Sequence, residues 1–216
     1  MRAVQGALLV AFAAGCDPEF TYSGFQTHNY MGLDGDRNWA YVLDDNTLEW
    51  RLKVDKGPEE TRDGSAVYPL DYGQENLGTQ EYTLLYTIWW SSDSRDGIRI
   101  HEIMDERAGK SSIAFETPIV IADPQMIPGE SVTTETDGLT IVSTLDSQGS
   151  CPNDWITGTP WDCLNFEVDD GAEGGSGLPL IGRWELATDY GPSRFQQTEY
   201  TSDWVLSTAY WDESGD

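Results

Sequence analysis

Hydrophobic and polar residues alternate strictly along several stretches of the chain. In residues 48–54 the apolar side chains hold the even positions and the charged side chains the odd positions. Residues 164–168 and 183–190 repeat this alternation. Because successive side chains of a β-strand point to opposite faces of the sheet, the pattern predicts strands with one buried and one hydrated face.

Two further stretches, residues 82–90 and 139–145, are apolar at both parities and predict more fully covered, central strands. Weaker candidates are separated by turn-forming Asp, Asn and Gly residues; they are 38–43, 66–72, 98–104, 113–121, 130–135 and 203–211. No stretch carries an apolar stripe of helical period over three turns. The sequence predicts an all-β fold with little helix: a single antiparallel β-sandwich or barrel-like sheet of about ten strands.

The composition indicates a folded chain with a large negative charge. The 216 residues include 38 Asp and Glu but 12 Lys and Arg, which gives a formal charge of −26. With 38% hydrophobic residues and nine Trp, the chain can still bury a core. Nucleic acid is excluded as an expected partner because binding phosphates requires clustered cations. The acids are spread over predicted loops and hydrated strand faces, which indicates adaptation of the whole surface.

The first residues are typical of an export signal. Met1-Arg2 supplies a positive charge, and residues 7–14 form an apolar run that is too short to span a membrane. The following Ala13-Ala14-Gly15-Cys16 resembles the lipobox of bacterial lipoproteins. The resemblance implies cleavage after Gly15 and attachment of acyl chains such as palmitate to Cys16. An ordinary secreted protein in which Cys16 is a spare thiol is the alternative.

These patterns predict three segments: a cleaved signal peptide at 1–15, a lipidated N-terminus and tether at 16–30, and a single β-rich domain at 31–216. Acyl chains on Cys16 would make a membrane the permanent partner of the domain. Asp17 resembles the signal that retains lipoproteins at the inner membrane of enterobacteria, a rule that many other bacteria do not follow. The expected location is therefore the bacterial cell envelope, on the periplasmic side or at the cell surface.

The two remaining cysteines, Cys151 and Cys163, are expected to form a disulfide. Disulfides persist in exported proteins, and the residues between these two are rich in turn formers. A zinc site is disfavoured because the spacing lacks a second close pair of ligands.

Residues with catalytic chemistry do not assemble into a recognisable motif. The only histidines are His28 and His101, and neither belongs to a nucleophile or zinc-protease signature. Alternation places His101 on the more polar face of a strand. Paired carboxylates could serve a glycan hydrolase, but 38 acids make accidental pairs common. An enzymatic site is therefore not expected, although the hydrolase stays an alternative.

Two ligand sites deserve testing. Asp34, Asp36 and Asn38 place side-chain oxygens at alternate positions, which resembles the start of a calcium-binding EF-hand loop, but Trp39 stands where that loop needs Gly. A polar turn is the alternative, and no cofactor other than this calcium is predicted. Trp155 and Trp161 belong to the expected disulfide loop, where exposed aromatic faces could stack on sugar rings.

The expected function is that of a lipid-anchored, non-enzymatic binding or structural module of the envelope, for glycan or for a protein partner. A hydrolase with paired carboxylates and a carrier of an apolar ligand are the alternatives. The chain also resembles bacterial lipoproteins of unassigned function whose mature domain opens with a Gly-x-x-x-Trp-x-Tyr strand, here Gly35, Trp39 and Tyr41. That similarity implies no activity.

Overall fold

A computed structural model describes residues 26–33, 35, 37–44, 49–107, 109, 111–151, 161–171, 176–197 and 202–211. It contains one short 3₁₀ helix and thirteen strands in the following order: η1 (Thr27–Tyr30), β1 (Arg37–Leu43), β2 (Trp50–Lys56), β3 (Glu60–Arg62), β4 (Ser65–Asn76), β5 (Tyr82–Asp93), β6 (Gly97–Asp105), β7 (Ser111–Ala122), β8 (Ser131–Thr136), β9 (Leu139–Cys151), β10 (Trp161–Asp169), β11 (Gly182–Ala187), β12 (Gly191–Gln197) and β13 (Trp204–Trp211).

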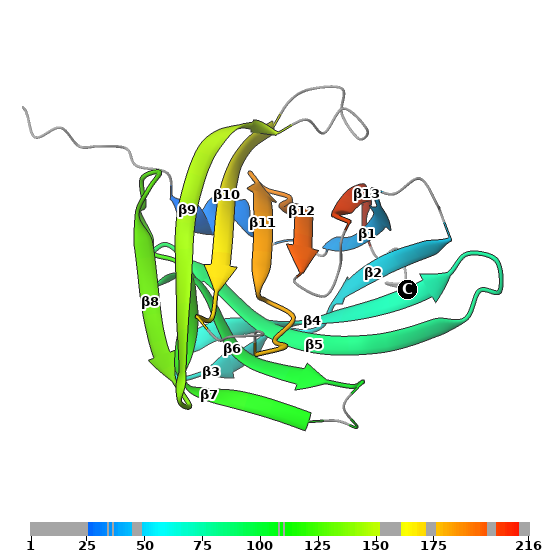
Figure 1. The fold of residues 1–216 in the computed structure, drawn as a ribbon, viewed down its shortest axis with the longest axis horizontal. Coiled ribbons are helices and arrows are strands. Elements are labelled where there is room, and N and C mark those ends of the chain that lie inside the picture. The colour runs from blue at the N-terminus through cyan, green and yellow to red at the C-terminus, as the bar shows by residue number, and fades with distance from the viewer. Residues whose placement is uncertain are drawn as a thin grey trace, which may run out of the picture.

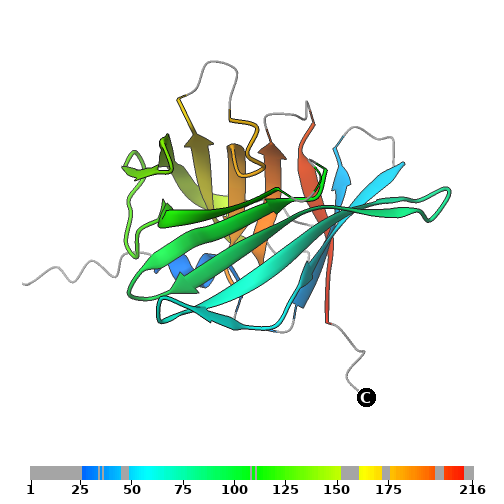
Figure 2. The same ribbon diagram turned by 90° about the horizontal axis from the view of Figure 1, so that it is seen from below.

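All strand pairs are antiparallel, and most neighbours in the sheet are also neighbours in the chain. The sheet order is β7-β6-β5-β4-β2-β1-β13-β12-β11-β10-β9-β8, with β3 paired to β4 beside this path. The pairing of β1 with β13 joins the first and last strands. Figures 1 and 2 show the resulting sheet curled almost into a barrel, with β4–β7 crossing behind β9–β12. The predicted all-β antiparallel fold is confirmed, with thirteen strands where about ten were expected.

Large aromatic side chains fill the inside of the curled sheet. Trp184 of β11 stacks on Phe195 of β12, with ring centroids 4.9 Å apart, and meets Trp90 of β5 edge-on at 5.8 Å. Tyr41 of β1 contacts Phe195 edge-on from the neighbouring side. The apolar parity of the strands therefore points inward, as alternation requires, and one core joins the two halves of the sheet.

The sheet opens between β7 and β8, and polar side chains bridge this opening. The backbone N–H of Val120 donates to the Thr134 hydroxyl at 3.0 Å, and that of Thr117 donates to the Thr136 hydroxyl at 3.2 Å. The Ser143 hydroxyl donates to the carbonyl of Ile121 at 2.7 Å. Side chains thus satisfy edge groups of β7 that a backbone ladder would otherwise pair.

The chain before residue 31 also packs against the sheet. Thr27 and Tyr30 of η1 are buried. The Thr27 hydroxyl donates to the carbonyl of Asp123, and the Tyr30 hydroxyl donates to Asp162 Oδ2 at 2.8 Å. Burial and this carboxylate raise the pKa of Tyr30 to about 12. Thr27 and Tyr30, which belong to the predicted tether at 16–30, therefore pack against the sheet.

Candidate functional site

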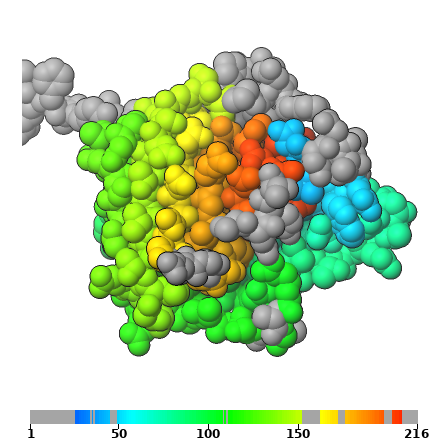
Figure 3. Space-filling model, in the orientation of Figure 1, coloured from blue at the N-terminus to red at the C-terminus, as the bar shows by residue number. Residues whose placement is uncertain are grey.

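A polar groove lies on the outer face of the sheet formed by β9–β12, opposite the aromatic core. Alternation sends Phe166, Trp184 and Phe195 inward, where each is at least 97% buried. The residues beside them in the chain point outward into a cavity of about 240 Å³. Its lining comprises Asp146, Asn165, Phe166, Arg183, Trp184, Glu185, Arg194, Phe195, Gln196 and Asp203. Figure 3 shows this face of the molecule, with β9–β12 coloured from yellow-green to orange.

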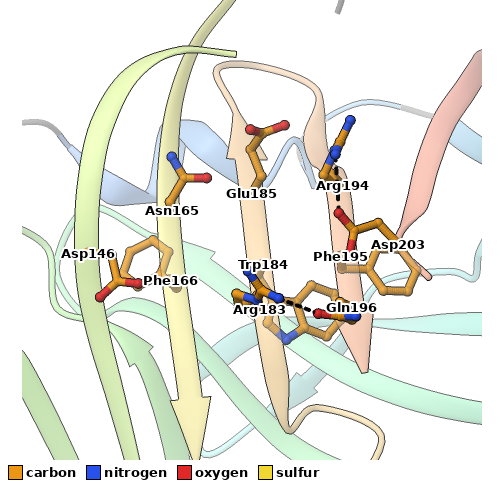
Figure 4. A pocket seen from close by; sticks show the side chains of 10 residues that line it. All are labelled: Asp146, Asn165, Phe166, Arg183, Trp184, Glu185, Arg194, Phe195, Gln196 and Asp203. Carbon is orange, nitrogen blue, oxygen red and sulfur yellow. Dashed lines mark hydrogen bonds and ion pairs between the residues drawn. The ribbon is translucent and has the colours of Figure 1, made fainter. Parts of the chain in front are cut away.

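Strand register aligns the polar residues in two rows across the groove. Asn165 of β10 lies opposite Glu185 of β11, which lies opposite Arg194 of β12. In the adjacent row Arg183 lies opposite Gln196. Side chains at such opposed positions on one face are close enough to share a ligand. Figure 4 shows Asn165, Glu185 and Arg194 in line on three successive strands.

Two register shifts coincide with the groove. One lies between Asn165 and Phe166 in the pairing of β10 with β9, and the other lies between Glu185 and Leu186 in the pairing of β11 with β12. The extra residue of such a shift bends and twists its strand, and bulges commonly redirect side chains near binding sites. The shifts place Asp146 and Ser193 outside the regular pairing of their strands.

Hydrogen bonds hold most of the groove side chains in fixed positions. The Asn165 amide donates to the Ser147 hydroxyl at 3.1 Å, and the Ser193 hydroxyl donates to Glu185 Oε1 at 2.7 Å. Arg194 pairs with Asp203 at 3.2 Å. Arg183 donates to the Gln196 amide oxygen at 2.6 Å. A groove organised in this way offers donors and acceptors without the entropy cost of ordering them on binding.

The disulfide between Cys151 and Cys163 lies beside this groove. The structure contains this bond, in agreement with the expectation from the sequence, with the two Cα atoms 5.5 Å apart. It ties the end of β9 to the start of β10, and both cysteines are buried. The Cys163 sulfur lies 3.9 Å from the Ser193 hydroxyl, which itself bonds Glu185. Glu185 and the two sulfurs are close together, but the sulfurs are bonded to each other and are therefore not thiolate ligands for a metal.

The residues predicted to bind calcium are described only in part. Asp34 and Asp36 lie outside the described residues. Asn38 is buried, and its Oδ1 accepts a hydrogen bond from the backbone N–H of Lys56 at 2.8 Å. The Lys56 ammonium donates to the carbonyl oxygens of Leu33 and Gly35 at 2.9 and 2.6 Å. The ammonium group of Lys56 thus bonds two carbonyl oxygens of the segment predicted to bind calcium. The calcium site stays a prediction.

The predicted glycan-binding and lipidation residues also fall largely outside the description. Gly15, Cys16 and Trp155 are not among the described residues. Trp161 is the first residue of β10, the strand that carries Asn165 into the groove, and its backbone pairs with Cys151. Trp161, the second tryptophan of the predicted sugar-binding loop, therefore belongs to a strand of the groove, and sugar binding by Trp155 and Trp161 stays a prediction.

His101, on the part of the barrel formed by β5 and β6, is buried. Nε2 of His101 on β6 lies 2.8 Å from the Ser91 hydroxyl on β5. The β3–β4 hairpin covers this region, because Arg62 of β3 pairs with Glu102 and stacks over Trp89. Burial first, and then the nearby Arg62 and Arg99, lower the pKa of His101. The sequence placed His101 on the polar face but did not reveal its cover.

Sequence reasoning did not identify the groove. Asn165, Glu185 and Arg194 are ordinary polar residues at hydrated positions of their strands, and only the register brings them into line. The one available signal was the alternation of polar and apolar residues in 164–168 and 183–190. It indicated a hydrated face but not which residues lie next to each other on it.

Comparison with known proteins gives little further information. No protein-family model and no curated protein sequence matches the chain. The fold resembles the crystal structure of a provisionally named lipoprotein from Parabacteroides distasonis, with 11% sequence identity and a TM-score of 0.38 over 84% of this chain and 98% of that one. No helix in the described part of the chain is long and apolar enough to cross a membrane.

Proposed function

We propose that the protein is an exported, lipid-anchored binding module of the bacterial envelope and that the groove on β9–β12 is its ligand site. The anchor rests on the lipobox-like Ala13-Ala14-Gly15-Cys16, and the disulfide is consistent with export to an oxidising compartment. The binding role rests on one observation: polar side chains from several strands converge on a single cavity of about 240 Å³.

The chemistry of the groove favours a small polar ligand, for which a sugar ring is one candidate. The cavity is smaller than the roughly 300–1,000 Å³ sites of drug-sized molecules. Amide, carboxylate and guanidinium groups suit hydroxyl-rich ligands because they supply several donors and acceptors in fixed geometry. The aromatic side chains form the floor but are almost fully buried, so affinity would come mainly from hydrogen bonds.

The two alternatives receive less support from the described residues. A hydrolase requires one carboxyl group that stays protonated and donates a proton, whereas Asp203 is ion-paired with Arg194, Glu185 accepts a hydrogen bond from Ser193 and Asp146 is exposed to solvent. A carrier of an apolar ligand requires a large apolar cavity, whereas Trp39, Trp90 and Trp204 are among the large side chains packed inside the sheet.

Binding is tested by titrating the purified protein with a panel of neutral disaccharides, including cellobiose, in a calorimeter. Asn165→Ala and Glu185→Gln should each weaken binding about tenfold, because each removes a hydrogen-bonding group that faces the ligand. Glu167→Gln is the matched control, since Glu167 is exposed on β10 but does not line the cavity. Binding that survives both groove substitutions but is lost in the Trp155→Ala, Trp161→Ala double variant would move the site to the disulfide loop.

The anchor has its own test. Mass spectrometry of the N-terminal peptide from the native host should show an acylated Cys16 as the first residue. An unmodified Cys16 that is still preceded by Gly15 would refute lipidation.

A further inference from the structure

Arg183 stands out among the cations of this acidic chain. Most described Arg side chains form ion pairs with acids; these are Arg51, Arg62, Arg95, Arg99, Arg107 and Arg194. Arg183 is exposed and bonds the neutral Gln196 instead. Its cross-strand neighbour Glu167 is also exposed and forms no ion pair with it in the described structure. The groove therefore presents a guanidinium whose charge no acid of the described residues neutralises by direct contact.

Asp146 presents the opposite charge from the other side of the groove. It lies on β9, is exposed, and forms no hydrogen bond or ion pair with any described residue. Strand β10 separates it from Arg183 on β11. Two strand spacings put the two backbones roughly 10 Å apart, and both residues line the same cavity. A ligand in this cavity can meet a carboxylate at one end and a guanidinium at the other (Figure 4).

The overall charge disfavours ligands that carry only one of these charges. A chain of charge −26 repels anions at long range, so a simple anion would approach Arg183 against the field of the whole molecule. A simple cation is attracted to acids spread over the entire surface and gains little from this particular groove. A zwitterion has no net charge, so it avoids the long-range repulsion and can still contact both groups.

We propose that the groove selects a small zwitterion of dipeptide size, whose ammonium group contacts Asp146 and whose carboxylate contacts Arg183. This inference rests on the proposed function of the groove and narrows its ligand class. Asn165 lies on β10, the strand between the two charged residues, and Glu185 lies two residues from Arg183 on β11, so both can bond the amide groups of such a ligand. Arg183 forms charge-assisted, bidentate hydrogen bonds to a carboxylate, which gives geometric selectivity as well as affinity.

The test uses dialanine and two derivatives that each lack one charge, N-acetyl-dialanine and dialanine amide. Calorimetric titration of the purified protein should give at least about tenfold weaker binding for each derivative than for dialanine. Arg183→Gln should weaken dialanine but leave dialanine amide unchanged. Asp146→Asn should weaken dialanine but leave N-acetyl-dialanine unchanged. This crossed pattern assigns each charge of the ligand to one residue.

Two control variants remove equal charges away from the cavity: Glu135→Gln on β8 and Arg95→Gln in the exposed turn after β5. Both should bind dialanine like the parent protein. The inference is overturned if dialanine does not bind at millimolar concentration, or if the derivatives bind as well as dialanine. If cellobiose binds in a manner sensitive to Asn165→Ala while dialanine does not, the zwitterion inference fails and the proposed function stands. If neither probe binds, both fail.

Discussion

Two parts of the outer surface of the barrel carry similar charged residues. Those on β5 and β6 are covered by other parts of the chain, whereas those on β10–β12 line an open groove. On β5 and β6 the chain covers its own surface: Arg62 from β3 stacks over Trp89 and pairs with Glu60 and Glu102, and His101 is buried against Ser91. On β10–β12 an equivalent set of Arg, Glu and amide side chains lines an open groove. The covered face pairs these polar groups with one another, whereas in the groove Asp146 has no partner among the described residues and Arg183 bonds only a neutral amide.

The largest expected effect concerns the aromatic side chains on the two sides of the sheet. Trp184→Ala should lower the free energy of unfolding by about 3–5 kcal/mol, because Trp184 is buried against Phe195 and Trp90. Trp89→Ala should cost about 1–2 kcal/mol, because Trp89 is only partly buried and loses chiefly its contact with Arg62. Urea unfolding of both variants measures these changes in the free energy of unfolding. Equal changes would show that Trp89 on the covered outer face contributes as much to stability as Trp184 in the core.

A smaller effect should separate the two arginines. Arg62→Ala removes the ion pairs with Glu60 and Glu102 and the stacking on Trp89, and should destabilise the protein by about 1 kcal/mol. Arg183→Ala should change stability by less than about 0.5 kcal/mol, because its only bond in the described structure is to Gln196. Both variants can be unfolded in urea beside the parent protein. A larger loss for Arg183→Ala would mean that this residue has a structural role.

The smallest expected effect is a pH dependence of stability that arises from His101 on the covered face. The pKa of His101 is lowered in the folded state, so the unfolded chain binds a proton more readily. The resulting stability is fully present above the unfolded pKa near 6.5 and declines as pH falls below it. Unfolding of the parent protein and of His101→Gln between pH 8 and pH 5 should therefore show a steeper acid loss in the parent protein. If the free energy of unfolding changed with pH equally in both proteins, burial of His101 would not be the cause of the acid loss.

The sequence predicted the strands well because alternation is a local property. Residues 82–90 and 139–145 fall within β5 and β9, and the disulfide followed from cysteine counting and export. The expectation that both are central strands is wrong for β9, which is the second strand from the end of the sheet and is buried only at alternate positions over 139–145. Alternation also suggested one strand through residues 183–190, but β11 ends at Ala187 and β12 begins at Gly191. Gly191 has a φ of 83°, and a Cβ there would lie 2.6 Å from the carbonyl oxygen of Met31, a tertiary contact that no local pattern contains.

The groove could not be predicted because it depends on register. Asn165, Glu185 and Arg194 lie on three strands, and a shift of one residue in either pairing would separate them and turn apolar side chains outward. The two register shifts beside them have no sequence signature in this chain. The alternation likewise placed His101 on the more polar face of its strand, but the residues that cover it come from β3, where the hydrophobic pattern predicts no strand.

Ligand binding at the groove on the outer face of β9–β12 can be followed residue by residue. Titration of the ¹⁵N-labelled protein with dialanine and, separately, with cellobiose, followed by two-dimensional NMR of the backbone amides, tests it most directly. The largest shifts should occur at cavity residues, with dialanine at Asp146, Asn165, Arg183 and Glu185, while Ser91 and His101 on the covered face stay unchanged. Largest shifts on the covered face, or no shift with either probe, would contradict it.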